Sequence, residues 1–89
     1  MMPPKRVDAN QPEIVAALRK AGCSVQHTHE VGRGCPDLLI GYRGRNYCLE
    51  LKSEKGTLTS AELEWHWNWN GKVAIARTVD EALAEVGAL

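Results

Sequence analysis

Two short runs joined by a polar link constrain the fold of this chain more than any other feature. The runs are 37–42 (DLLIGY) and 47–52 (YCLELK), and the linking segment 43–46 (RGRN) contains a glycine. Runs of this length, with apolar residues at alternate positions and turn residues at their ends, are typical of β-strands. A short glycine-containing link between two such runs predicts a hairpin. We therefore expect two adjacent antiparallel strands in the middle of the chain.

The alternation gives this hairpin two chemically different faces. A turn centred on Gly44 and Arg45 would set Asp37 opposite Lys52, with Glu50 as a diagonal neighbour of Asp37. The apolar face then comprises Leu38, Ile40, Tyr42, Tyr47, Leu49 and Leu51. The other face comprises Asp37, Leu39, Gly41, Cys48, Glu50 and Lys52. A pairing shifted by one residue would separate the two carboxylates and expose the apolar side chains, so burial of the core and clustering of the charges require the same register.

Patterns on either side of the hairpin predict three helices and two further strands. Helix starts are expected at Asn10 or Gln11, at Thr59 and at Thr78, the last two with the spacing of a capping box. The predicted helices run to about residues 21, 70 and 86, and the predicted strands cover 23–30 and 72–77. The order α-β-β-β-α-β-α predicts an α/β fold with a mixed sheet and helices on both faces. We expect one domain over residues 10–89, preceded by a polar arm at residues 1–9.

Composition limits the classes of protein to which the chain can belong. It has 89 residues, and its 11 basic and 11 acidic residues give a net charge of zero. No apolar run approaches the roughly 20 residues of a membrane span, and we expect no signal peptide. Three irregularly spaced cysteines favour a reducing cytoplasm over a disulfide framework. The basic excess lies in residues 32–58, which hold five basic and three acidic residues.

The charged face of the hairpin has the composition of a metal-dependent hydrolytic site. Two neighbouring carboxylates, Asp37 and Glu50, repel each other unless a cation lies between them. Carboxylate oxygens favour Mg²⁺ or Mn²⁺, which can activate water and stabilise charge on a phosphoryl oxygen. Lys52 could contact the same water or the phosphate as a compact positive charge. The alternative is a cross-strand ion pair between Asp37 and Lys52, with Glu50 exposed to solvent.

The same residues carry a resemblance to a nuclease family. Gly34-Cys35-Pro36-Asp37, followed after twelve residues by Glu50-Leu51-Lys52, resembles the signature of the PD-(D/E)xK nuclease superfamily. The expected element order is that of the superfamily's core. Residues 31–83 more specifically resemble the virus-type replication-repair nuclease (VRR-Nuc) domain. The matching segments are Gly34–Leu38, Glu50–Lys52, Leu58–Ser60, Trp65 and Gly71–Val73.

The resemblance implies a Mg²⁺-dependent endonuclease, with Mn²⁺ as a substitute, that hydrolyses DNA phosphodiester bonds. It implies Asp37 and Glu50 as metal ligands, the Leu51 carbonyl as a third, and Lys52 as the group that orients water or stabilises charge. It further implies branched, junction or flap DNA as substrate, a homodimer, and a phage or other mobile element whose protein acts in the host cytoplasm. The alternatives are a catalytically inactive nucleic-acid-binding module and a structural protein in which the charges form an ion-pair cluster.

Two acidic residues outside the hairpin have both a functional and a structural interpretation. Glu13 matches a position where the superfamily often has an acid near the metal, but in a first helical turn it also complements the helix dipole. Glu62 stands where the family often has Gln. It could face the site and add negative charge there, or simply close the capping box with Thr59.

Other residues are candidates for contacts with DNA, with metal or with a second subunit. Phosphate contacts are expected among the loop and arm cations Arg33, Arg43, Arg45, Lys55, Lys5 and Arg6, although each could be a solvated surface charge. We expect Trp65 and Trp69 in the core, and Trp67 at a dimer interface or as a base-stacking platform. Zinc is disfavoured, because Cys23, Cys35, His27 and His29 lack paired ligand spacing.

Overall fold

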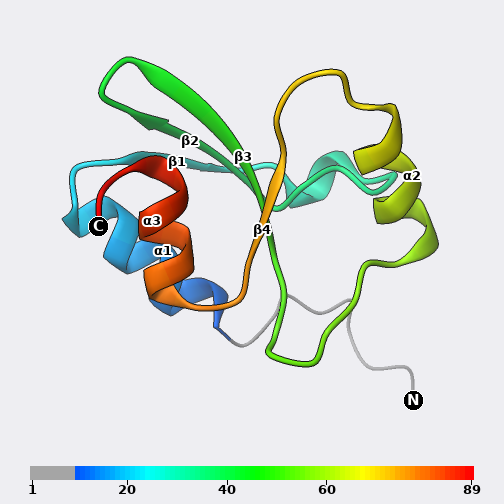
Figure 1. The fold of residues 1–89 in the computed structure, drawn as a ribbon, viewed down its shortest axis with the longest axis horizontal. Helices are drawn as coiled ribbons and strands as arrows, with labels where there is room; N and C mark the ends of the chain where they lie inside the picture. The colour runs from blue at the N-terminus through cyan, green and yellow to red at the C-terminus, as the bar shows by residue number, and fades with distance from the viewer. Residues whose placement is uncertain (1–9) are drawn as a thin grey trace.

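Four strands form one mixed sheet that separates α1 and α3 from α2 (Figure 1). The structure is a computed structural model that describes residues 10–89, so the polar arm with Lys5 and Arg6 lies outside the described residues. The strands are β1 (Ser24–His27), β2 (Leu38–Tyr42), β3 (Arg45–Leu51) and β4 (Ala74–Ala76), in that spatial order. β1, β2 and β3 pair antiparallel, and β4 pairs parallel to β3. The expected small α/β fold with a mixed sheet is confirmed.

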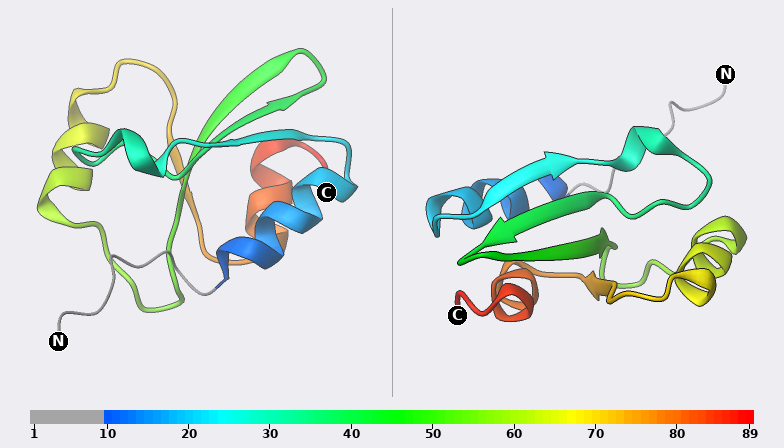
Figure 2. Two further views of the ribbon diagram at one scale, coloured as in Figure 1. Left: turned by 180° about the vertical axis from the view of Figure 1, so that it is seen from behind. Right: turned by 90° about the horizontal axis from the view of Figure 1, so that it is seen from above.

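The helices are α1 (Gln11–Lys20), α2 (Ser60–Asn68) and α3 (Val79–Val86), with a short 3₁₀ helix at His29–Val31. α1 and α3 pack side by side on one side of the strands, and α2 lies apart from them on the other (Figure 2). On the apolar face of the hairpin, the four aliphatic residues are fully buried against α1 and α3, whereas Tyr42 and Tyr47 are partly buried. The shared core contains Leu38, Ile40, Leu49 and Leu51 from the sheet and Ile14, Leu18, Ala82 and Val86 from the helices.

The hairpin turn lies one residue earlier than the sequence analysis placed it. The turn residues are Arg43 and Gly44, both with positive φ, as a type I′ turn requires. Leu39 consequently opposes Cys48 rather than Glu50. Each β2 residue thus has a partner two positions earlier in β3 than predicted. Because side chains alternate with a period of two, every side chain stays on its predicted face. Continued one pair beyond β2, this register sets Asp37 opposite Glu50 instead of opposite Lys52.

Two predicted strands are shorter in the structure. The predicted strand 23–30 covers only Ser24–His27, because after a last hydrogen bond from the Thr28 amide to the Asp37 carbonyl at 2.8 Å the chain turns into the 3₁₀ helix. The predicted buried strand 72–77 is reduced to Ala74–Ala76. Ala76 is buried but Ile75 is 39% exposed, because α1 and α3 cover only one face of β4.

α2 is attached to the sheet mainly through polar contacts. None of its residues is buried, and it ends at Asn68 rather than near Asn70. The prediction that Trp65 and Trp69 belong to the core is wrong: Trp65 is half-buried, and Trp69 is 47% exposed. The physical reason is that α2 faces the side of the hairpin that carries Glu50 and Lys52 and meets it through an ion pair between Glu62 and Lys52. Within residues 10–89, no helix has the length and apolar character needed to cross a membrane.

Candidate metal and phosphate site

The Asp37 carboxylate is held in place from two sides. It is 6% exposed, at the entrance to β2. Its Oδ2 accepts a hydrogen bond from the Leu51 backbone amide at 2.8 Å, and its Oδ1 lies 3.2 Å from Nδ1 of His29. The Leu51 contact ties Asp37 directly to the segment of β3 that carries Glu50. The two acids of the predicted site are therefore brought together across the hairpin.

Glu50 is the most deeply buried charged residue among those described, at 1% exposure. Its Oε2 lies 3.6 Å from Nζ of Lys52, whereas its Oε1 is buried and has no hydrogen-bond partner. Burial and, next, the neighbouring Asp37 carboxylate raise the pKa of Glu50 to about 9, and Glu62 adds to this effect. The exposed Glu50 of the structural alternative is therefore not found. The protein holds this acid where an additional cation is needed to keep it ionised.

Lys52 connects the strand acids to α2. Besides its contact with Glu50, its Nζ lies 2.7 Å from Oε1 of Glu62. The same Oε1 accepts the Thr59 backbone amide at 2.9 Å, and the Glu62 amide donates to Oγ1 of Thr59 at 3.2 Å. Burial alone would raise the pKa of Glu62, but the hydrogen bonds from Lys52 and Thr59 lower it overall. Glu62 therefore closes the capping box and faces the site at once, which combines both interpretations of this residue.

Gly34 allows α2 to approach the site closely. It has a φ of +83°, and a side chain there would collide with the carbonyl of Ala61 and come within 2.8 Å of the Glu62 amide nitrogen. Only glycine combines this backbone angle with so small a volume. Gly34 therefore lets the start of α2, which carries Glu62, pack against the loop that leads into Asp37.

The residues present fit a hard divalent cation. Two buried carboxylates side by side, one with an oxygen that lacks any partner, form an oxygen donor set of negative charge. Mg²⁺ is bound in proteins by one or two carboxylates together with water and backbone or substrate oxygens. Leu51, the candidate carbonyl ligand, is the last residue of β3 and lies beside Asp37. Residues 10–89 contain no group of three or more His, Cys, Asp or Glu side chains poised around one ion, so water and backbone would have to complete the shell.

Several predicted site residues lie elsewhere. Glu13 is exposed on α1, which covers the opposite face of the sheet, and no hydrogen bond or ion pair within the described residues links it to the strand acids. Arg43 and Arg45 are exposed at the hairpin tip, and Arg45 precedes Glu50 by five positions along β3, a distance of about 16 Å. The Arg43 guanidinium lies over the ring of Tyr42.

Two other predicted cations lie within a few residues of the site acids and Lys52 in the sequence. Arg33 is exposed in the loop that packs against α2, four residues before Asp37. Lys55 is exposed in the loop that follows Lys52. Arg77 fixes that loop by donating from Nη1 to the carbonyls of Ser53 and Gly56, each at 2.6 Å. These two cations are therefore better placed for contact with a phosphate chain than those of the hairpin tip.

The structure adds two histidines to the site. The 3₁₀ helix turns His29 toward Asp37, which alternation along a strand does not predict. His66 follows Glu62 by four residues on α2, and its buried Nε2 has no partner. Burial lowers the pKa of His66. His66 could have been predicted from the sequence, because residues four apart on a helix share one face and Glu62 faces the site.

Of the other zinc candidates, only Cys35 lies near the site: it is partly buried, and burial together with the charges of Glu50 and Asp37 raises the pKa of its thiol. Cys23 is buried in the core, and His27 contacts Gln11 at 3.1 Å, on the side of the sheet that α1 covers.

Comparison with known proteins gives no additional assignment. The chain matches no family model, no curated protein and no solved structure.

Proposed function

We propose that this chain is a Mg²⁺-dependent endonuclease that hydrolyses DNA phosphodiester bonds on a PD-(D/E)xK fold of the VRR-Nuc type. One observation carries the proposal: Asp37 and Glu50 are buried side by side, Glu50 keeps an oxygen without a partner, and the Lys52 ammonium lies next to it. A purely structural cluster would not need a second buried carboxylate of raised pKa. The order of helices and strands along the chain, which is the order that the resemblance predicts, supports the proposal.

Each residue of the site has a distinct role in this proposal. Asp37 and Glu50 would hold the cation, with the Leu51 carbonyl beside them. When bound, Mg²⁺ supplies Lewis acidity and a water molecule of lowered pKa. Lys52 orients the attacking water or stabilises the negative charge that develops on the phosphate. His29 keeps the Asp37 carboxylate in its orientation through the 3.2 Å contact.

Glu62 makes this site more negative than the Gln that the family often carries. It shares the Lys52 ammonium with Glu50, so a phosphate of the substrate must compete with two carboxylates for the same charge. Electrostatic attraction of DNA must then come from cations at the border of the site, above all Arg33 and Lys55. If these cations contact phosphates, the affinity for DNA should fall steeply as the salt concentration rises.

The proposal is tested by incubating the protein with end-labelled linear, flap and four-way-junction DNA in Mg²⁺, Mn²⁺ or EDTA. We expect metal-dependent cleavage that is lost in Asp37→Asn and Lys52→Ala. Asp80→Asn is the matched control, because Asp80 is an exposed acid in the first turn of α3, on the other side of the sheet. DNA binding without cleavage would instead indicate an inactive binding module. Neither binding nor cleavage would leave a structural ion-pair cluster.

A second copy of the chain is the proposed partner of the outer face of α2. Leu63 and Trp67 lie on this face with exposures of 60% and 87%, next to a cavity of about 470 Å³. Pairing through this face would bury apolar surface that a small domain otherwise leaves in water. A symmetric dimer would also present two sites to two DNA strands. Light scattering at micromolar concentration tests this, and a monomer would exclude it.

A further inference from the structure

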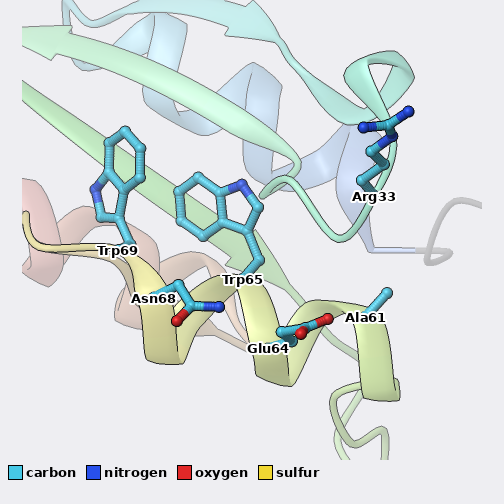
Figure 3. Close-up of a pocket in the computed structure, with 6 residues that line it drawn as sticks. All are labelled: Arg33, Ala61, Glu64, Trp65, Asn68 and Trp69. Carbon is cyan, nitrogen blue, oxygen red and sulfur yellow. The ribbon is translucent and has the colours of Figure 1, made fainter.

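A second cavity lies between α2 and the loop that leads to Asp37. Its volume is about 220 Å³, and it is lined by Arg33, Ala61, Glu64, Trp65, Asn68 and Trp69 (Figure 3). We call it the Trp65 pocket. Pockets for drug-sized ligands measure about 300–1,000 Å³, so this one suits a single small ring system.

Two stacked indole rings form one wall of the pocket. The rings of Trp65 and Trp69 have centroids 4.5 Å apart and an interplanar angle of 19°. In Figure 3 they stand side by side on α2, and Arg33 lies on the far side of Trp65. A side chain at Gly71 would come within 2.9 Å of Nε1 of Trp69, so glycine there leaves room for this ring. The pair offers a preformed flat π surface at the edge of the pocket.

The polar groups around this surface select the kind of ring that would bind. Arg33 provides a positive charge that repels cationic ligands and attracts an anion attached to the ring. Glu64 and Asn68 provide a carboxylate and an amide, which can pair with the edge of a base. A flat ring with hydrogen-bonding edges and an attached anion is a nucleotide.

The pocket also lies close to the proposed reactive centre. Glu62, which binds Lys52, precedes Trp65 by three residues on α2, a rise of about 4.5 Å. A base in the pocket would therefore belong to a nucleotide near the phosphate that meets Lys52.

We propose that the Trp65 pocket binds one unpaired base of the DNA substrate, stacked against Trp65, with its phosphate near Arg33. The inference rests on the proposed nuclease function and specifies its substrate. A base within a continuous duplex is covered by its neighbours on both faces and cannot stack on protein. The substrate must therefore have a nucleotide without a partner near the cleaved bond, as flaps and some junctions do.

The experiment measures binding without cleavage. Asp37→Asn protein in EDTA is titrated against three fluorescein-labelled DNAs of one length: single-stranded, blunt duplex, and duplex with one unpaired nucleotide. In this background we expect Trp65→Ala to weaken binding of the first and third DNAs by about 5- to 150-fold, the usual effect of losing one base–aromatic stack. We expect little change for the blunt duplex. Trp65→Phe, which keeps a ring, should retain most of the affinity.

Leu89→Ala is the control, because Leu89 is an exposed apolar residue beyond the end of α3, on the other side of the sheet from the pocket. We expect less than about a twofold change, with light scattering used to compare oligomeric states. Arg33→Ala should reduce the slope of log affinity against log salt for single-stranded DNA by about 0.7, whereas Trp65→Ala should leave that slope unchanged.

The failure of this inference and that of the proposed function can be told apart. Equal weakening of all three DNAs by Trp65→Ala, or no weakening of any, overturns the pocket assignment even if the wild-type protein cleaves DNA. Equal effects of Trp65→Ala and Leu89→Ala overturn it as well. Selective, Trp65-dependent binding of unpaired bases by a protein that cleaves no DNA supports the pocket and rejects only the nuclease proposal.

Discussion

Replacing Gly34 by alanine tests whether the close approach of α2 holds the site together. Gly34 and Gly44 have nearly the same φ, +83° and +79°, so alanine is strained at both. They differ in their surroundings, because an added methyl group meets the Ala61 carbonyl at Gly34 but nothing within 4 Å at Gly44. Gly44→Ala is thus a control that isolates the collision from the backbone strain.

The expected losses of stability follow from the backbone strain and from the collision. A left-handed backbone conformation costs a residue with a side chain about 1–2 kcal/mol, and this cost applies to both variants. Overpacking adds about 1–3 kcal/mol at Gly34 only. The extra cost should fall at the low end of that range, about 1 kcal/mol, because α2 has no buried residue and can move away. Such a movement would break the 2.7 Å contact between Lys52 and Glu62.

The assay combines urea unfolding with hydrogen exchange. We expect Gly34→Ala to have a free energy of unfolding about 1 kcal/mol below that of Gly44→Ala, which is about 4–8 °C in Tm for a domain of this size. Amide protection in α2 should fall in Gly34→Ala alone, and so should DNA cleavage. Equal stabilities, with unchanged protection of α2 in both variants, would refute the reasoning.

Two further predictions concern the acids of the site. In the folded, metal-free protein the pKa of Glu50 is about 9, whereas in the unfolded chain it is near 4.5. Between these pH values only the folded protein holds the proton, so the free energy of unfolding should fall as pH rises. The slope should be at most about 1.4 kcal/mol per pH unit. Urea titrations in EDTA at pH 5.5, 7 and 8.5 measure this slope, which Glu50→Gln should flatten; an identical slope in that variant would contradict the assignment. Asp37→Ala should be less stable than Asp37→Asn by about 1–3 kcal/mol, because only alanine leaves the buried Leu51 amide without an acceptor. Thermal unfolding of the two variants side by side checks this difference, and equal midpoints would argue against it.

Local patterns in the chain were enough to predict the elements and the faces of the hairpin. Asp37, Glu50 and Lys52 alternate with apolar residues that must be buried, and alternation has a period of two regardless of where the turn lies. The turn error therefore changed the partners of Leu39 and Asp37 but not their faces. Thr59 and Glu62 likewise specify a helix start through contacts only three residues apart.

The tertiary structure decided which distant residues reach the site. Glu62 meets Lys52 because Gly34 lets α2 come close, and no local pattern encodes that approach. His29 turns toward Asp37 because β1 ends early, and the tryptophans of α2 remain outside the core because the helix faces a charged surface. Short-range periodicity and capping act within a few residues of the chain and can be inferred from the sequence. Burial and the pairing of charges depend on elements that only folding brings together, and these set the environment of Glu50.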